Sequence, residues 1–408
     1  MSFLYHILLY FYSFAVSIFS FFNQKAKQWI DGRKNILQHI QSTVNLADEI
    51  VWFHCASLGE YEQAKPVIEK LKQHNPSFKI LVTFFSPSGY EIRKNDPLLD
   101  YVFYLPIDTK YNAQQFLKIT KPKMAFFVKY EFWFNYINQL KQNNIPTYLI
   151  SGVFRDNQLF FKWYGKWYKK VLHGFTHFFV QNNYSKELLL ANNFTNVTLS
   201  GDTRFDRVYE NSLHPKQLPL IEKFKGNSLL IIGGSTWQPE EKILADYIKL
   251  NPEQKLIIAP HDISEKHLIE IEKNIQQKTL RYSKANNENI TSTTILIVDS
   301  IGLLANMYQY SDIALIGGGF TGALHNILEP ASFGNVVLFG PKHHKFHEAD
   351  EIIAFNGGFS IANSNDFVKK IELILSNLNE YKTNSKNYIN NNKGATNQLL
   401  NKLNNYGK

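Results

Sequence analysis

The chain has 408 residues, of which 44% are hydrophobic and 19% are charged, so it can form two or three domains with buried cores and is neither disordered nor fibrous. The formal net charge of +9 is a dilute excess. It fits anionic partners such as nucleotides, phosphorylated lipids or a membrane surface, but it does not indicate nucleic acid. The single cysteine, Cys55, excludes an intrachain disulfide and a cysteine-based metal site, and it fits a reducing compartment.

An uncharged apolar stretch at residues 3–22 is interrupted only by one histidine and three serines. A helix of that length spans about 30 Å, the thickness of the hydrocarbon core of a bilayer. Four basic residues follow at positions 25–34, and by the positive-inside rule they place the remaining chain in the cytoplasm. We therefore expect a membrane-anchor helix over residues 1–24. The alternative is a buried amphipathic helix or an anchor in the plane of the membrane, because the segment is rich in Phe and Tyr.

After about residue 45, short β-rich runs alternate with segments of helical period such as 61–73 and 131–142, which is typical of a parallel sheet flanked by helices. The strands predicted in the first series are 50–53, 79–83, 102–105, 124–128, 147–150, 177–180 and 197–200. The strands predicted in the second series are 229–232, 255–259, 295–298, 313–316 and 336–339. Between the series, residues 211–226 contain two prolines and no clear period, and they are predicted to be a linker.

The pattern predicts an α/β fold with two facing Rossmann-like domains. We place the N-terminal domain at 25–210, the C-terminal domain at 211–385 and a helical tail at 386–408. In open parallel sheets the ligand lies beyond the carboxyl ends of the strands, so we expect it in a cleft between the two sheets.

The first predicted strand is followed by His-Cys-Ala-Ser-Leu-Gly-Glu at residues 54–60. Gly59 lets the backbone approach a ligand, and the start of the next helix offers unpaired N–H groups. At this position the carboxylate of Glu60 can act as a general base toward an attacking hydroxyl. The alternative is a first-turn glutamate that only stabilises the helix dipole, and spacing alone favours that interpretation.

Two more strand ends in the first series carry polar residues. At residues 86–90, Ser86 is predicted to cap a helix that has Pro87 at its first position. At residues 129–133, the sequence Lys-Tyr-Glu-Phe-Trp follows a strongly apolar strand. Such a cluster either lines a site or covers the edge of a core.

In the second series, glycines follow two strands, at 233–234 and 317–319. Glycines at strand ends can bring backbone amides to a phosphate, although a tight turn explains them equally and neither matches a Walker A loop. His325 and Glu329 are spaced i, i+4 and are predicted to share one helix face, where Glu329 can accept hydrogen bonds from ribose hydroxyls. A metal site that uses His343, His344 and His347 is a less favoured alternative, because the H-E-x-x-H spacing is absent.

Seven motifs occur in a fixed order behind the apolar N-terminal segment. They are W-F-H-C-A-S-L-G-E at 52–60, S-P-S-G at 86–89, Y-E-F-W at 130–133, S-G-D-T-R-F-D at 200–206, G-S-T at 234–236, H-N-I-L-E-P-A at 325–331 and F-G-P at 339–341. With these motifs the chain resembles, over about residues 1–370, the Kdo transferases, the lipid A 3-deoxy-D-manno-octulosonic acid transferases of Gram-negative bacteria. Proteins of that family are glycosyltransferases of GT-B architecture.

The resemblance implies transfer of Kdo from CMP-Kdo to a lipid A precursor, lipid IVA, with inversion, at the cytoplasmic face of the inner membrane. It implies no cofactor, no metal and no nucleic-acid partner, and it makes Glu60 the catalytic base. The residues implied to bind the donor nucleotide are Gly234, Ser235, Thr236, His261, Gly318, His325, Asn326 and Glu329. The residues implied to face the acceptor or the sugar are Ser57, Gly59, Ser86, Gly89, Glu131 and Arg155.

The chain departs from the family pattern at a few of these positions. Lys129 stands where an acidic residue is usual, Phe134 replaces a proline, and Pro260-His261 replaces an Arg-His pair. Arg155 lies near the position of the usual arginine. Two other functions stay open at this stage: a nucleotide-sugar 2-epimerase of the same fold, and a membrane-tethered scaffold without catalysis.

Overall fold

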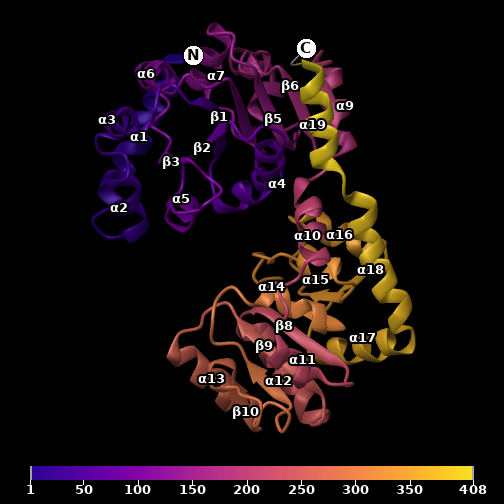
Figure 1. Cartoon of the computed structure of the whole chain (residues 1–408). Coiled ribbons are helices and arrows are strands. Elements are labelled where there is room, and N and C mark those ends of the chain that lie inside the picture. Colours follow the sequence, from indigo (N-terminus) through magenta and orange to yellow (C-terminus); the bar gives the residue numbers. More distant parts are fainter. Residues whose placement is uncertain (1, 407–408) are drawn as a thin grey trace. The chain divides into compact units, whose positions relative to one another are not determined.

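The computed structural model describes residues 2–406. Residues 1, 407 and 408, at the outer ends of the expected anchor and tail, lie outside the described residues. The chain forms two compact units. Unit 1 comprises the chain up to Arg207 together with Gly394 onward, and unit 2 comprises Val208–Lys393 (Figure 1). The expectation of a cleft between two facing sheets stays a prediction.

Unit 1 contains a seven-stranded sheet in the order β3-β2-β1-β4-β5-β6-β7, with every neighbouring pair parallel. Its strands are β1 (Glu49–Cys55), β2 (Phe78–Phe84), β3 (Tyr101–Tyr104), β4 (Met124–Val128), β5 (Thr147–Gly152), β6 (His177–Val180) and β7 (Val197–Leu199). Its helices are α1 (Ser2–Phe19), α2 (Gln24–Asp31), α3 (Ile36–Thr43), α4 (Leu58–His74), α5 (Pro87–Arg93), α6 (Lys110–Thr120), α7 (Phe134–Gln142), α8 (Lys166–Lys169), α9 (Asn183–Ala191) and α19 (Ala395–Tyr406).

Unit 2 contains a second parallel sheet of seven strands, in the order β10-β11-β9-β8-β12-β13-β14. Its strands are β8 (Leu230–Thr236), β9 (Lys255–Pro260), β10 (Thr279–Arg281), β11 (Ile295–Ile297), β12 (Ile313–Ile316), β13 (Val336–Phe339) and β14 (Gly358–Ser360). Its helices are α11 (Pro219–Lys225), α12 (Gln238–Leu250), α13 (Glu265–Ile275), α14 (Leu304–Met307), α15 (Leu328–Ser332), α16 (His347–Ala354), α17 (Ser364–Ser376) and α18 (Leu378–Asn392). Helix α10 (Thr203–Leu213) begins in unit 1 and ends in unit 2.

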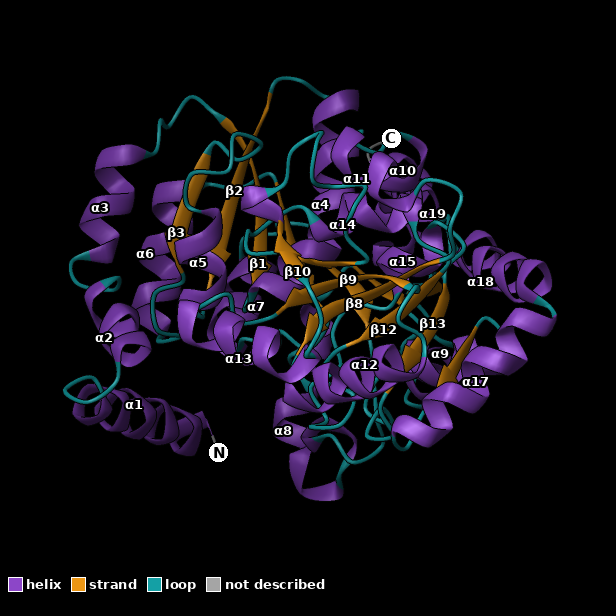
Figure 2. Cartoon of the chain, turned by 90° about the horizontal axis from the view of Figure 1, so that it is seen from below, coloured by secondary structure: helices purple, strands orange, loops and turns teal. Residues whose placement is uncertain are grey.

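The strands read as continuous apolar runs because both faces of each sheet are covered by helices (Figure 2). In β1, Ile50 and Trp52 belong to one core cluster, whereas Val51 and Phe53 belong to the other. Helix α19 contributes Leu399, Leu400 and Leu403 to the second cluster. The end of the chain therefore completes the core of unit 1, although about 180 residues of unit 2 separate it in sequence.

The predicted strands are all present, but two further strands escaped sequence analysis. Strands β10 and β14 lie at the two edges of the second sheet, are three residues long and are partly exposed. The prediction of a linker at 211–226 is wrong, because α10 runs to Leu213 and α11 begins at Pro219. Proline at the first helical position favours a helix start as well as a turn, so its presence did not exclude a helix.

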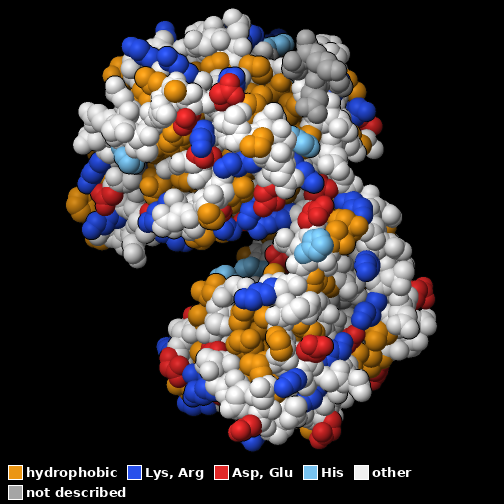
Figure 3. All heavy atoms as spheres, viewed as in Figure 1, with side chains coloured by type: hydrophobic (Ala, Val, Ile, Leu, Met, Phe, Trp, Pro, Cys, Tyr) orange, Lys and Arg blue, Asp and Glu red, His pale blue; other side chains and the backbone are white. Residues whose placement is uncertain are grey.

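Basic side chains are spread over the visible face of each unit, with acidic side chains among them (Figure 3). This distribution agrees with the dilute positive charge expected from composition.

Helix α1 is attached to unit 1 by polar contacts near its start. The Tyr5 hydroxyl donates to Asp108 Oδ2 at 2.6 Å, and the Tyr12 ring contacts those of Trp29 and Phe85. Large apolar side chains of α1 stay exposed, including Leu8, Phe11 and Phe14 at 59%, 68% and 62%. Within residues 2–406, no helix combines the length and apolar character that crossing a membrane requires. The expected spanning segment is therefore not found.

Asp108 links α1 to α7 and is fully buried. Besides Tyr5, it accepts hydrogen bonds from the backbone N–H groups of Asn135 and Tyr136, both at 3.0 Å. These amides belong to the first turn of α7, where no carbonyl within the helix can pair with them. The carboxylate therefore caps α7 and fixes α1 with the same side chain.

We expect Asp108→Ala to lower the free energy of unfolding of unit 1 by about 3 kcal/mol, because two buried amides and one hydroxyl lose their acceptor. Urea unfolding measures this loss, and hydrogen exchange across residues 2–19 should accelerate in the variant. Asp31→Ala, which removes an exposed partner of Lys34, serves as the control and should change neither quantity. Equal stability of the Asp108→Ala variant and the unaltered chain would contradict this role.

Candidate active site

The strand order of each sheet reverses at one point, and the sequence motifs lie beside it. In unit 1 the reversal falls between β1 and β4, so residues 56–60 and 129–133 leave the sheet as neighbours. In unit 2 it falls between β8 and β12, where Gly234 pairs with Ile316. Such points in open parallel sheets leave a crevice at the carboxyl ends of the strands, where ligands bind. The topology thus selects the same segments as the motifs.

Glu60 lies in the first turn of α4, and its carboxylate is held by the residue that caps the helix. Its Oε2 accepts hydrogen bonds from the Ser57 backbone N–H at 2.7 Å and from the Ser57 hydroxyl at 3.2 Å. Burial, together with the negative charge of Glu131, raises the pKa of Glu60 to about 7, and these hydrogen bonds and Lys129 oppose the rise. The capping role is therefore real, but a pKa near neutrality also suits a group that must accept a proton.

Glu131 is anchored in a buried hydrogen-bond network. Its Oε2 lies 3.0 Å from His54 Nε2 and accepts a hydrogen bond from Trp133 Nε1 at 2.5 Å. On the other side of the ring, His54 Nδ1 lies 2.9 Å from Thr83 Oγ1. His54 and Thr83 are fully buried. The network fixes where the negative charge of Glu131 stands, and this charge acts on Glu60.

Two cationic side chains lie beside the same cluster. Lys129 follows β4 in the left-handed region, with φ of 64°, and its charge favours the ionised form of Glu60. The Arg155 guanidinium lies 5.8 Å from the centre of the Tyr130 ring, and Lys129 Nζ lies 5.4 Å from that centre. Positive φ in a non-glycine residue is strained, and such residues concentrate at functional sites. Arg155 is exposed and free to meet an anionic group.

The other predicted residues of unit 1 have local structural roles. Ser86 caps α5 by accepting from the Ser88 N–H at 3.2 Å, and its own N–H donates to Ala56 at 2.8 Å, so the two strand-end turns are joined. Gly59 is exposed. Gly89 is buried, and a side chain there would meet the Phe84 ring at 2.2 Å. The small size of Gly89 is therefore required by packing.

In unit 2, the glycines bring backbone segments together. A side chain at Gly317 would meet the Ser235 carbonyl oxygen at 1.8 Å, and Gly318 has φ of +85°, which disfavours other residues. Ser235 itself has φ of 51°. The end of β8 at 234–236 and the loop that follows β12 are therefore packed backbone against backbone at the point where the strand order reverses. Packing within the protein explains these glycines. The tight turn of the alternative interpretation is present at 317–322 but not at 233–234, which lie inside β8.

Three aromatic rings stack at the carboxyl edge of the second sheet. The rings of Trp237 and His261 lie 4.6 Å apart at 29°, and those of His261 and His325 lie 4.7 Å apart at 31°. Burial first, and the neighbouring His261 second, lower the pKa of His325. Trp237 Nε1 donates to His325 Nε2 at 3.4 Å. This arrangement offers an aromatic surface of the kind on which a nucleobase stacks.

The predicted sharing of one helix face by His325 and Glu329 is wrong. Helix α15 begins only at Leu328, and His325 lies in a segment without regular secondary structure, where its N–H donates to Gly317 at 3.0 Å. Asn326 Oδ1 accepts from the Leu328 N–H at 3.0 Å. The competing asparagine side chain delays the helix start, as is typical of Asn at such positions. Glu329 is half-buried in the first turn of α15.

Sequence reasoning missed four residues that support these sites. Glu240 is fully buried and accepts from the Gly318 N–H at 3.0 Å and from the Trp237 N–H at 3.1 Å, which fixes the glycine loop. Glu241 accepts from the Thr236 hydroxyl at 3.1 Å. A proline at the start of α12, followed by two acidic residues in its first turn, is a helix-start signal that could have revealed Glu240. His54 and Trp237 carry no such signal, since a buried histidine and an exposed tryptophan are common.

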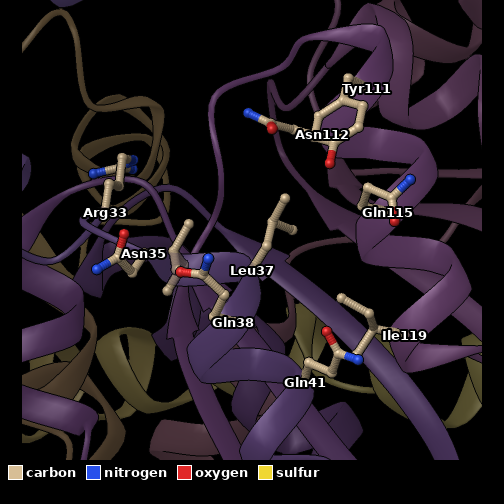
Figure 4. A pocket seen from close by; sticks show the side chains of 10 residues that line it. Arg33, Asn35, Leu37, Gln38, Gln41, Tyr111, Asn112, Gln115 and Ile119 are labelled. Atoms are coloured by element: carbon tan, nitrogen blue, oxygen red, sulfur yellow. The ribbon is translucent and has the colours of Figure 1, made fainter.

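A cavity of about 500 Å³ in unit 1 lies apart from these residues. Figure 4 shows side chains from α3 and α6 around it, several of them amides. Arg33 reaches its rim, but its guanidinium is already bound to the carbonyls of Trp29, Phe85 and Leu105. No residue of the predicted site lines this cavity, so we do not include it in the candidate site.

The chain is similar in sequence to a known protein family and to several of its members. Residues 28–207 match the family described as 3-Deoxy-D-manno-octulosonic-acid transferase (kdotransferase). A 3-deoxy-D-manno-octulosonic acid transferase of Aquifex aeolicus is 27% identical over 347 residues, which cover 82% of this chain and 89% of that protein. A bifunctional glycosyltransferase/methyltransferase of Fusobacterium nucleatum is 30% identical over 375 residues, which cover 87% of this chain. The match spans only 56% of the length of the Fusobacterium protein.

Solved structures share the fold at low sequence identity. The UDP-GlcNAc 2-epimerase of Neisseria meningitidis, bound to UDP-GlcNAc, superposes with a TM-score of 0.60 at 17% identity and covers 87% of this chain and 99% of its own. A UDP-GlcNAc 2-epimerase of Methanocaldococcus jannaschii gives 0.54 at 13% identity and covers 84% and 98%. At such identities the likeness establishes the architecture of two parallel α/β domains and nothing about the reaction.

We expect Glu60 to titrate near pH 7 in the folded chain. Glu131→Gln removes the neighbouring negative charge and should lower this pKa by about one unit. Carbon-13 NMR of chain labelled at the glutamate carboxyl carbons measures both values, with the Glu60 signal assigned by its loss in Glu60→Gln. Glu69→Gln, on the same helix but partly exposed, is the control and should leave the titration unchanged. A Glu60 midpoint that stays the same in Glu131→Gln would overturn the proposed coupling.

Proposed function

Because the chain belongs to the 3-deoxy-D-manno-octulosonic acid (Kdo) transferase family, we propose that it is a glycosyltransferase that moves Kdo from CMP-Kdo to a lipid A precursor. The observation that carries the proposal is the carboxylate of Glu60, whose pKa is raised to about 7 at the carboxyl end of β1. The family resemblance implies a catalytic base at this glutamate, and the electrostatic environment of Glu60 supports that role.

In the proposed reaction, Glu60 takes the proton from a hydroxyl of the acceptor sugar as the oxygen attacks the anomeric carbon of Kdo. A new carbon–oxygen bond forms on one face of the sugar, while the bond to the CMP phosphate oxygen breaks on the other. CMP leaves with the electron pair, and the anomeric configuration inverts. Glu60 must be ionised at the start, so the active form is populated above the pKa of this group. Lys129 and Arg155 supply positive charge that suits the carboxylate of Kdo or the phosphates of the acceptor.

We assign donor binding to unit 2. Ser235 and Thr236 are the last two residues of β8, where Ser235 has a positive φ, and Gly318 lies in the packed loop after β12. The rings of His261 and His325, with Trp237, suit stacking of the cytosine, which is worth about 1–3 kcal/mol per base on an aromatic side chain. Glu329 suits hydrogen bonds to the ribose hydroxyls, with Asn326 exposed beside it.

We propose that the chain works at the cytoplasmic face of the inner membrane, with α1 in the plane of the interface. Contacts of Tyr5 and Tyr12 with unit 1 hold α1 along the body of that unit, and its exposed apolar side chains suit the headgroup boundary. Basic residues of the adjoining α2, such as Lys25 and Lys27, suit anionic lipid. The acceptor in this proposal is a phosphorylated lipid presented at that surface.

We expect Glu60→Gln to reduce Kdo transfer by at least 100-fold, the magnitude typical of loss of a general base, while CMP still protects the protein against heat. Incubation with CMP-Kdo and a tetraacylated lipid A precursor, followed by mass analysis of the lipid, measures transfer. Saturating CMP should raise the melting temperature equally in both proteins, because binding at about 100 times Kd adds about 2.7 kcal/mol. Near-normal turnover by Glu60→Gln would remove the base assignment.

Glu69→Gln is again the matched control and should keep full activity. Protection against heat by different nucleotides distinguishes the alternative functions that the sequence analysis left open. Stronger protection by UMP than by CMP would favour a UDP-sugar epimerase, and no protection by any nucleotide would favour a scaffold without catalysis.

A further inference from the structure

A cluster of metal-ligating side chains lies in the loop after β13 and the first turn of α16. Over residues 2–406, it is the one group of three or more His, Cys, Asp or Glu whose ligand atoms all lie within 4.8 Å of one another. Its members are His343, His344 and Asp350. The donor-binding proposal uses none of these residues.

The distances in this cluster are close to those of a metal site. Asp350 Oδ1 lies 3.1 Å from His343 Nδ1 and 3.9 Å from His344 Nδ1. Around a tetrahedral zinc ion with bonds of about 2.0–2.1 Å, ligand atoms are about 3.4 Å apart. Shifts of a few tenths of an ångström would therefore bring both pairs with Asp350 to this spacing, and the ligand atoms of the two histidines lie within 4.8 Å of each other. Asp350 and His344 are exposed and able to make such shifts.

His343 supplies an independent observation. Its side chain is only 8% exposed and its ring packs against that of Phe339, with centres 5.1 Å apart. Although Asp350 Oδ1 lies 3.1 Å from Nδ1, this buried nitrogen makes no hydrogen bond. A buried polar atom without a hydrogen-bond partner destabilises the folded chain. A cation between the imidazole and the carboxylate would satisfy both groups.

We propose that His343, His344 and Asp350 bind one divalent transition-metal ion of the zinc class. Two imidazoles and a carboxylate are ligands for zinc, cobalt or nickel, whereas calcium and magnesium prefer oxygen ligands throughout. Three protein ligands leave at least one position open to water, since His344 and Asp350 face solvent. The nearby His347 pairs with Glu351 at 3.2 Å and is not required.

A metal bound here would connect α16 to the glycine loop of the candidate donor site. The Lys342 N–H donates to Gly319 at 2.8 Å, and the backbones of Gly340 and Gly319 touch. Fixing His343 and His344 to Asp350 restrains the segment that carries Lys342. We therefore expect the ion to slow hydrogen exchange at residues 317–322, an effect that does not depend on the activity of the chain.

The test uses the full chain without a polyhistidine tag, titrated with Zn²⁺ by calorimetry and with Co²⁺ by visible absorption. We expect one ion per chain and the absorption of a site with nitrogen ligands. His344→Ala and Asp350→Asn should each weaken binding at least tenfold and abolish the slowing of exchange at 317–322. Both residues are exposed, so these variants should fold normally, which circular dichroism checks.

His214→Ala, which removes an exposed histidine of the same unit, should bind as the unaltered chain does. The proposal would be overturned if the unaltered chain bound neither Zn²⁺ nor Co²⁺. It would also be overturned if His344→Ala and Asp350→Asn bound the ion as well as His214→Ala does. Because binding and exchange are measured without substrate, failure of the metal site and failure of the proposed transferase function are distinguishable.

Discussion

The buried network of Thr83, His54, Glu131 and Trp133 sets the electrostatics of the candidate active site. It holds a carboxylate at the end of β4, next to the end of β1, where Glu60 begins α4. Two carboxylates in a partly buried site cannot both ionise easily, so one of them binds protons at a higher pH. Burial first, and the charge of Glu131 second, raise the pKa of Glu60, whose own anchor is the helix cap at Ser57. A common helix-capping pattern thereby carries a carboxylate whose pKa is raised to about 7.

Much of the fold could be predicted because its physical signals are local. Apolar strands such as β4, β6, β12 and β13 have the predicted bounds, since a strand buried on both faces is a short apolar run between polar turns. Edge strands β10 and β14 are too short and exposed to give that signal. The start of α15 was misplaced because Asn326 competes for the backbone amide of Leu328, which helical spacing does not reveal.

The motif residues of the candidate site could be predicted from the sequence, whereas the buried residues that hold them in place could not. Glu60, Ser86 and the glycines stand at strand ends, where periodicity breaks in a visible way. His54 and Glu240 lie inside elements, and their roles come from partners distant in sequence, Glu131 and Gly318. Only three-dimensional packing brings those pairs together. Gly89 is the opposite case. It belongs to a recognisable motif, but a larger residue there would clash with the Phe84 ring, so packing explains it.

The two units carry different parts of the proposed chemistry. Unit 1 holds the tuned carboxylate and the exposed apolar helix, and unit 2 holds the aromatic stack and the packed glycine loops. In both units the candidate residues lie where the strand order of a parallel sheet reverses. This shared topology explains why epimerases with other chemistry superpose on the chain, and why the reaction has to be argued from side chains.

The most direct test of the central claim is the pH dependence of single-turnover Kdo transfer by the unaltered chain, with the lipid product followed by mass spectrometry. The ionised form of Glu60 must accept the proton, and its pKa is raised to about 7. The account predicts a rate that is low in acid, rises through an apparent pKa near 7 and then levels. A rate that stays flat across that range, or a lipid that gains no Kdo at any pH, would contradict it.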